Sequence, residues 1–271
     1  MQLTIDQKNR VSEEVKKILS SRIESFPDLS LQNRNAPFHE AVLDCFKEQF
    51  RDLNIETPRL IAIASWLHGL STSLGTGFEN FGHILSGGYK RKFTGPYTLK
   101  VKKSQSLAID EIIRQLKSSQ IKPNLLEENS KIFNFNSGED EVDALGFTAD
   151  IFIEKKDKIV AIEMKSVRPN AGEGRGEKQK ILYGKAALKL LYPKHDIKFF
   201  VGFPFDPTAV KPTEYDKKRF FNYLIEFKKF FAEDEVMIAD ELWDYLSSSK
   251  HTMNQILEVI RETIMIVNNR G

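Results

Sequence analysis

The chain has 271 residues, of which 41% are hydrophobic, and 40 Lys and Arg side chains nearly balance 38 Asp and Glu side chains. This composition predicts an ordinary globular protein with a real core. No stretch approaches the roughly 20 consecutive apolar residues of a membrane span, and the lone cysteine, Cys45, cannot form an intramolecular disulfide. We expect no secretory signal, because the first residues lack a basic flank followed by an apolar run. These features exclude a multi-cysteine zinc site and favour a cytoplasmic protein without membrane contact.

The first hundred residues are expected to be mainly helical. Apolar residues recur at helical spacing from Val11 to Ile23, and Pro37 and Pro58 suit the first turns of two further helices. The helix that begins near Pro58 is almost wholly apolar, which predicts that it is buried. Several glycines follow, and we expect them to separate it from a short helix around residues 78–85.

The hydrophobic period changes in the middle of the chain. An amphipathic helix is expected from Ser104, and a second one from Glu177 to Leu191. Strand-like runs occupy residues 131–135, 148–153, 158–165 and 197–203. The order of strands and helix predicts an α/β fold with a mixed β-sheet flanked by helices. We expect a mainly helical region, residues 1–103, packed on a core with C-terminal helices, residues 104–271, as one compact domain.

The two central strands end in charged side chains. Residues 148–165 read T-A-D-I-F-I-E-K-K-D-K-I-V-A-I-E-M-K, which predicts a hairpin with K-K-D-K as its turn. Side chains alternate between the faces of a strand, so Glu163 and Lys165 share one face. Asp150 lies opposite them on the preceding strand. The hairpin therefore predicts two carboxylates and one ammonium at one edge of a sheet.

This combination suits the hydrolysis of a phosphodiester. Carboxylate oxygens of Asp150 and Glu163 are ligands that hold Mg²⁺ while it keeps several waters, and the metal lowers the pKa of a bound water. Lys165 beside them is placed to orient the attacking water or to stabilise the transition state. The adjacent carboxylates favour its charged form, so we expect positioning and electrostatics rather than a free-amine base.

These residues resemble the active-site signature of the PD-(D/E)XK nuclease superfamily. Asp150 is followed after twelve residues by Glu163-Met164-Lys165 on a β-hairpin, although Ala149 stands where the signature has proline. Three further segments resemble type II restriction endonucleases of the TdeIII group, namely residues 74–82, 166–188 and 241–246.

The resemblance implies a restriction-endonuclease-like fold and a Mg²⁺-dependent enzyme. Its substrate would be double-stranded DNA, cut at a short G·C-rich palindrome of the GGNCC type. It implies a catalytic role for Glu79, in G-F-E-N-F-G, as a fourth acidic position on a helix before the sheet. The alternative for Glu79 is a carboxylate that satisfies free amides at a helix N-terminus. A palindromic target favours a homodimer, and a prokaryotic restriction enzyme has a cognate DNA methyltransferase as its genetic partner.

Two segments are candidates for contacts with DNA. The first carries Lys90, Arg91 and Lys92 among aromatic residues, in a stretch from Asn80 to Ile109 without any Asp or Glu. The second flanks the end of the hairpin with Arg168, Arg175, Lys178 and Gln179, and its G-E-G-R-G run, residues 172–176, is expected to be a phosphate-binding loop. A solvated hairpin or surface is the alternative for both segments. Gln179 and Tyr183, one helical turn apart, also resemble a Gln-x-x-x-Tyr element of some relatives, and a plain helix face is the alternative for this pair.

Several other residues are assigned no chemistry. We interpret His68 as a hydrogen-bonded core residue, His83 as a solvated neighbour of Glu79, and Cys45 as a small buried hydrophobe. The acidic run at residues 139–143 is interpreted as a solvated loop, and Asp143 is the alternative metal ligand to Asp150.

Three functions remain open from the sequence. The first is a type II restriction endonuclease, which cuts at fixed sites. The second is a repair or recombination nuclease with the same core and no sequence specificity. In the third, a non-catalytic DNA-binding protein, Glu163 and Lys165 form only an ion pair at the end of a strand.

Overall fold

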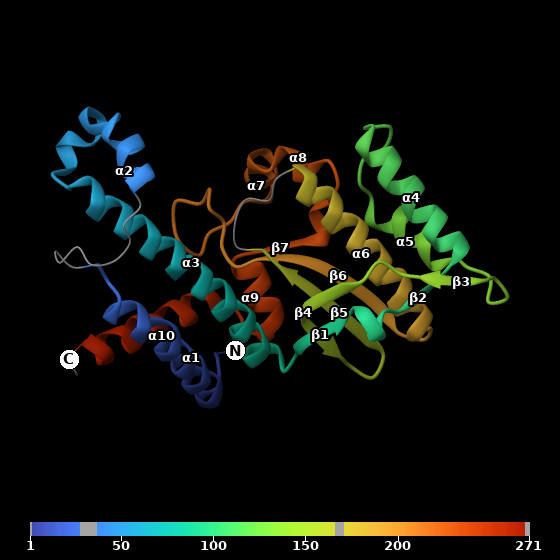
Figure 1. Ribbon diagram of the computed structural model, residues 1–271. Helices are drawn as coiled ribbons and strands as arrows, with labels where there is room; N and C mark the ends of the chain where they lie inside the picture. Colours follow the sequence, from blue (N-terminus) through green and yellow to red (C-terminus); the bar gives the residue numbers. More distant parts are fainter. Residues whose placement is uncertain (1, 28–36, 166–170, 269–271) are drawn as a thin grey trace.

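The computed structural model describes residues 2–27, 37–165 and 171–268 (Figure 1). Its N-terminal part is helical, as expected. Figure 1 shows α1 lying beside α10, with the long helix α3 running from α2 towards the sheet. The elements of this part are α1 (Ile5–Glu24), α2 (Pro37–Asp44), the 3₁₀ helix η1 (Lys47–Leu53) and α3 (Thr57–Ser86).

Helix α3 corrects two predictions. It is continuous over 30 residues, so the glycines do not break it, and it ends at Gly87, whose φ of 70° is in the left-handed region. A Cβ at Gly82 would lie 2.2 Å from Cδ1 of Ile151, so this glycine lets the helix approach the sheet closely. The helix is also not buried throughout, because its described buried residues all lie in its second half, at Gly77, Phe81, Gly82 and Leu85.

Two single residues differ from their expected environments. His68 is an exposed residue in the partly buried first half of α3 and is not a core residue. Cys45 is an exposed free cysteine at the end of α2 and not a buried hydrophobe. Both predictions took apolar neighbours in the sequence as evidence of burial, whereas this helical part extends away from the sheet (Figure 1).

A five-stranded sheet forms the centre of the molecule, in the order β1-β4-β5-β6-β7. Strand β4 is antiparallel to both of its neighbours, β1 and β5, whereas β5, β6 and β7 run parallel to one another. The strands are β1 (Tyr89–Phe93), β4 (Phe147–Glu154), β5 (Lys158–Met164), β6 (Asp196–Phe203) and β7 (Val236–Ile238). The middle strands are buried on both faces, in agreement with their almost continuous apolar sequences.

A small second sheet lies beside this core. It pairs β2 (Lys100–Lys102) with β3 (Glu141–Asp143), so the acidic run is partly a strand and not only a loop. The strand expected at residues 131–135 is also wrong. Most of it belongs to helix α5 (Leu125–Phe133), which Asn124 caps by accepting hydrogen bonds from the backbone N–H groups of Leu126 and Glu127.

Helices cover both faces of the main sheet. Helix α6 (Ala171–Leu191) lies on one face, with α4 (Lys103–Lys117) and α5 outside it, and the second half of α3 and α9 (Asp240–Ser247) lie on the other (Figure 1). The remaining elements are the 3₁₀ helices η2 (Gly95–Tyr97) and η3 (Glu233–Glu235), and the helices α7 (Lys217–Tyr223), α8 (Ile225–Lys228) and α10 (Thr252–Asn268). This mixed sheet flanked by helices confirms the predicted fold class and is compatible with a restriction-endonuclease-like core.

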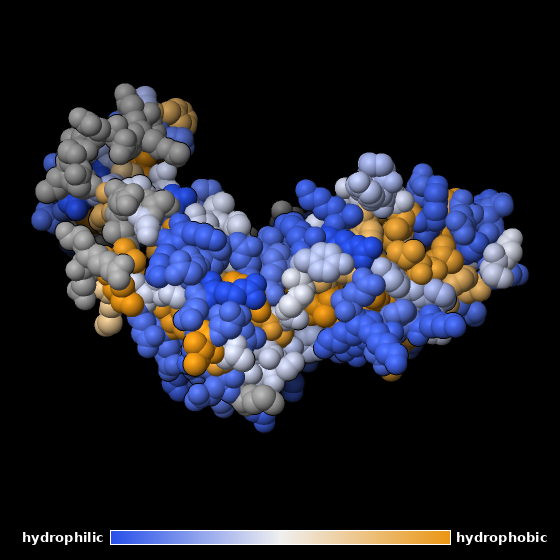
Figure 2. All heavy atoms as spheres, turned by 90° about the horizontal axis from the view of Figure 1, so that it is seen from below, coloured by the Kyte–Doolittle hydropathy of each residue, from blue (hydrophilic) through white to orange (hydrophobic). Residues whose placement is uncertain are grey.

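One face of the molecule is mainly polar. In Figure 2, hydrophilic side chains cover most of the face, with smaller apolar patches between them. No helix among the described residues is long and apolar enough to cross a membrane.

Candidate active site

The β4–β5 hairpin brings the sequence-predicted acids together. Its register pairs Ile151 with Ile162, which places Asp150 beside Glu163 at the next position. Asp150 Oδ2 accepts a hydrogen bond of 2.9 Å from the backbone N–H of Met164. Asp150 is 9% exposed and Glu163 is 8% exposed, so both carboxyl groups lie at the rim of the core with little water around them.

Glu163 lies between two lysines. Its Oε1 is 2.8 Å from Nζ of Lys180 and 3.3 Å from Nζ of Lys165. Burial and the nearby charge of Asp150 nevertheless raise the pKa of Glu163 above its ordinary value, because they outweigh the attraction of Lys180. A further cation between the two acids would therefore be electrostatically favourable.

Lys165 is held by acids from two elements. Its Nζ is 3.0 Å from Glu177 and 3.5 Å from Glu173, both on α6, in addition to its contact with Glu163 on β5. Burial favours the neutral amine, but the charges of Glu163 and Glu177 outweigh it and raise the pKa of Lys165 far above its ordinary value. Lys165 is therefore a fixed positive charge at neutral pH, which suits electrostatic stabilisation and not proton abstraction.

Glu79 reaches the same site from helix α3. Nζ of Lys90, on β1, lies 2.7 Å from Oε2 of Glu79 and 3.0 Å from Oδ1 of Asp150. Burial alone would lower the pKa of Lys90, but these two carboxylates outweigh it and raise the pKa. Glu79 lies within a continuous helix and not at a helix N-terminus, so the alternative role in capping does not apply.

Three residues near the site had no assigned role in the sequence analysis. His83 Nε2 lies 2.7 Å from the backbone oxygen of Asp150, so this histidine contacts the hairpin and is not simply a solvated neighbour of Glu79. Lys180 and Glu177 on α6 form an ion pair of 2.6 Å. Lys180 also contacts Glu163, and Glu177 also contacts Lys165. Residues 173, 177 and 180 are spaced three and four apart, so the sequence could have indicated that they share one face of a helix.

The donor set fits a hard divalent cation that keeps part of its water shell. Asp150, Glu163 and Glu79 contribute carboxylates from three different elements near the hairpin end, and Lys90 contacts those of Glu79 and Asp150. In the part of the chain that the structure describes, no group of three or more His, Cys, Asp or Glu side chains forms a ready metal-binding cluster. Lysine ammonium groups instead lie against these carboxylates, at Lys90, Lys165 and Lys180.

The basic residues of β1 differ in their surroundings. Lys92 is exposed, whereas the guanidinium of Arg91 lies over the rings of Phe93 and Phe152, 5.0 and 4.7 Å from the ring centres. Arg91 also donates a hydrogen bond of 3.0 Å to the hydroxyl of Tyr192. Its contacts hold β1 on the sheet, so among these neighbours Lys92 is the better placed for DNA.

The residues after the hairpin correct part of the predicted DNA interface. Arg168 lies outside the described residues. The expected phosphate-binding loop is the first turns of helix α6, where Arg175 is exposed and Gln179 is half-buried. Tyr183, the companion of Gln179, points to helix α4 instead, where its hydroxyl lies 2.8 Å from Oγ of Ser106.

Lys178 is fully buried and does not contribute to a DNA-binding surface. Its Nζ forms ion pairs of 2.5 Å with Glu128 and 2.6 Å with Glu235, and Lys185 lies 3.1 Å from Glu235. The physical reason is helical geometry. Residues 178 and 180 lie about 200° apart around a helix, so Lys180 faces the hairpin while Lys178 faces the opposite side.

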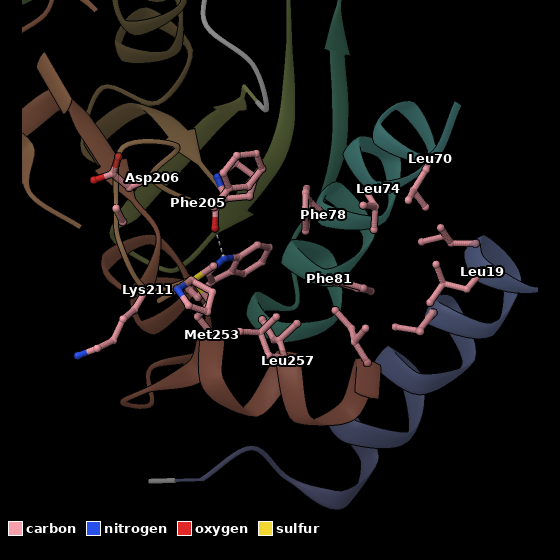
Figure 3. Close-up of a pocket in the computed structure, with 18 of the residues that line it drawn as sticks. Leu19, Leu70, Leu74, Phe78, Phe81, Phe205, Asp206, Lys211, Met253 and Leu257 are labelled. Atoms are coloured by element: carbon pink, nitrogen blue, oxygen red, sulfur yellow. Dashed lines mark hydrogen bonds between the residues drawn. The ribbon is translucent and has the colours of Figure 1, made fainter. Parts of the chain in front are cut away.

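An apolar cavity of about 650 Å³ lies apart from these charged residues. Figure 3 shows Leu70, Leu74, Phe78 and Phe81 of α3 facing Leu19 across it, with side chains of α10 below. Its walls carry almost no ionisable groups, so it offers no chemistry comparable to that at the hairpin end.

Comparisons with known proteins identify the family of this chain. Residues 3–264 match the family described as "Type II restriction endonuclease, HinfI". The chain is also 46% identical over 257 residues to "Type II restriction enzyme MjaII" of Methanocaldococcus jannaschii, an alignment that covers 93% of this chain and 68% of the relative. The chain therefore belongs to the HinfI family of type II restriction endonucleases, whose substrate is double-stranded DNA.

Proposed function

We propose that this restriction endonuclease cleaves DNA through a PD-(D/E)XK-type centre formed by Asp150, Glu163 and Lys165, with Glu79 beside them. The observation that carries the proposal is the convergence of these side chains at one end of the β4–β5 hairpin. Family membership supports site-specific cutting over both alternatives, the non-specific repair nuclease and the non-catalytic DNA-binding protein.

Asp150 and Glu163 would hold Mg²⁺, which supplies an activated water and charge neutralisation when bound. The Met164 amide fixes one oxygen of Asp150 and leaves the other for the cation. Lys165 stays charged and is positioned to stabilise negative charge that develops on the scissile phosphate. Lys180 and Glu177 hold Glu163 and Lys165 in place.

We further propose that the target is a short G·C-rich palindrome of the GGNCC type, as the TdeIII-like segments imply. Lys90, Lys92, Arg175 and Gln179 are candidates for contacts with the DNA, and arginine is the residue that most commonly reads guanine. Two-fold symmetry of such a target favours a homodimer. A cognate DNA methyltransferase that protects the host sequence, and a cytoplasmic location beside the DNA substrate, follow from the same proposal.

The test is cleavage of a plasmid of known sequence with Mg²⁺ by wild type and by Lys165→Ala. Lys156→Ala, in the exposed hairpin turn, is the matched control. We expect discrete bands from wild type and the control, and none from Lys165→Ala. Run-off sequencing of the products then gives the site. Equal cutting by all three proteins would refute the assigned centre, and ends at unrelated sequences would refute the GGNCC type.

A further inference from the structure

Lys90 occupies an unusual position between two acids of the candidate site. Its Nζ contacts Oε2 of Glu79 and Oδ1 of Asp150, at 2.7 and 3.0 Å, and these carboxylates come from α3 and β4. A single cation thus links two elements that share the site. The second oxygen of Asp150 is already bound to the Met164 amide, so Lys90 lies at the oxygen that remains for a metal ion.

An irregularity in the sheet places Lys90 there. Tyr89 pairs with Phe152 and Arg91 pairs with Ala149, so Lys90 alone lies opposite the two residues Asp150 and Ile151. Such a β-bulge changes the direction of a side chain and is common next to active sites. Arg91, the next residue along, turns to the aromatic rings of the sheet instead.

The ammonium of Lys90 is not locked in place. Its side chain is 41% exposed, whereas that of Asp150 is 12% exposed, so the lysine can leave towards solvent without disturbing the hairpin. While it stays, it offsets the repulsion between carboxylates held close together in a poorly solvated site. A divalent cation carries twice the charge and would compete for the same oxygens.

We propose that Lys90 fills the cation position between Glu79 and Asp150 in the metal-free enzyme, and that the entering metal ion displaces its ammonium, which then binds a phosphate of the DNA. This inference rests on the proposed role of Asp150 as a metal ligand. Its consequence is that binding of metal and binding of DNA support each other. The metal ion takes the carboxylates away from Lys90, and the DNA phosphate takes the ammonium of Lys90 away from the carboxylates.

The test is titration of the protein with Mn²⁺, followed by calorimetry or by the electron spin resonance of the free ion. Lys90→Met removes the competitor, so we expect it to bind Mn²⁺ about 10-fold more tightly than wild type. Lys92→Met is the matched control, because it removes the same charge from an exposed residue of the same strand. The Mn²⁺ affinity of Lys92→Met should stay within about two-fold of wild type. This comparison separates displacement of the Lys90 ammonium from a general effect of charge.

A second measurement follows the DNA. With Ca²⁺ in place of Mg²⁺, fluorescence anisotropy of a labelled duplex should show weaker binding by Lys90→Met than by wild type. Tighter metal binding together with weaker DNA binding is a combination that loss of structure would not produce. If Lys90→Met does not fold by circular dichroism, Lys90→Gln is measured by the same criteria.

The contradicting outcomes are distinct. Unchanged or weaker Mn²⁺ binding by Lys90→Met, while Asp150→Asn loses it, would overturn the role of Lys90 and leave the proposed active site standing. Unchanged Mn²⁺ binding by Asp150→Asn would instead overturn the metal site itself. Unchanged DNA affinity in Lys90→Met would overturn the contact with phosphate.

Discussion

At the scale of single residues, Glu235 is the main support of a buried ionic cluster. Its carboxylate oxygens lie 2.6 Å from Nζ of Lys178 and 3.1 Å from Nζ of Lys185. Glu128 forms an ion pair with Lys178. Burial raises the pKa of Glu128, but at Glu235 the two lysines outweigh burial and lower the pKa to about 2. The cluster joins α5, α6 and η3 behind the candidate site.

We predict that Glu235→Gln lowers the free energy of unfolding by about 3–5 kcal/mol at neutral pH, because two lysines lose their buried partner. The folded pKa of Glu235 lies below its ordinary value of 4.5, so its contribution is complete above that pH and is lost as the pH falls towards about 2. Urea unfolding at several pH values should show the difference from wild type shrinking in this window. Glu214→Gln, in an exposed pair with Lys211, should leave the stability close to that of wild type. A Glu235→Gln protein as stable as wild type would contradict the role of the cluster.

The residues of the candidate site could be predicted to different degrees. Alternation along β5 and the hairpin turn were sufficient to place Glu163, Lys165 and Asp150 at one edge. The roles of Lys178 and Lys180 could not be separated, because the rotation of a helix relative to a sheet depends on packing that the sequence pattern does not specify. The contact of Lys90 with Asp150 depends on a β-bulge, which has no sequence signal here.

At the scale of elements, the distance between α3 and β4 sets the geometry of the site. Gly82 lies against Ile151, the neighbour of Asp150. From the same helix, Glu79 contacts Lys90 of β1 and His83 contacts the backbone oxygen of Asp150. We predict that Gly82→Ala reduces both the DNA cleavage rate and the stability. The added methyl group meets a fully buried side chain, and overpacking of this kind costs about 1–3 kcal/mol.

Gly176→Ala is the matched control for this prediction. Gly176 lies in helix α6, and a Cβ there would meet nothing within 4 Å. Alanine is the better helix former, so this variant should gain about 0.5–1 kcal/mol of stability and keep its activity. Thermal unfolding and plasmid cleavage measure both effects. A Gly82→Ala enzyme with full activity would show that the close approach of α3 does not position the site.

The elements themselves were partly predictable. The apolar runs of β4, β5 and β6 identified the parallel and antiparallel core, because few other structures bury such runs. The continuity of α3 was not predictable, since the expected helix-breaking glycines lie where the helix packs closely, Gly77 against Ile18 of α1 and Gly82 against Ile151 of β4. The strand expected at residues 131–135 is instead mostly helix, because the cap at Asn124 and contacts with α4 and α6 favour a helix.

At the scale of the whole molecule, a palindromic DNA target requires two active sites related by a two-fold axis. We predict that sedimentation of the enzyme with duplex DNA and Ca²⁺ shows two copies of the 31.2 kDa chain on one duplex. The separation of the two sites would set the stagger of the cut. One copy per duplex at concentrations that support cleavage would contradict the dimer.

The most direct test of the central claim compares the two acids that the sequence offered as alternatives. Asp150 lies in the charged site, whereas Asp143 is an exposed residue of β3 paired with Lys100. Cleavage rates of one plasmid with Mg²⁺ should fall at least about 100-fold in Asp150→Asn and stay near wild type in Asp143→Asn, when both variants are folded by circular dichroism. An active Asp150→Asn enzyme would contradict the assignment of the catalytic centre to the end of the β4–β5 hairpin.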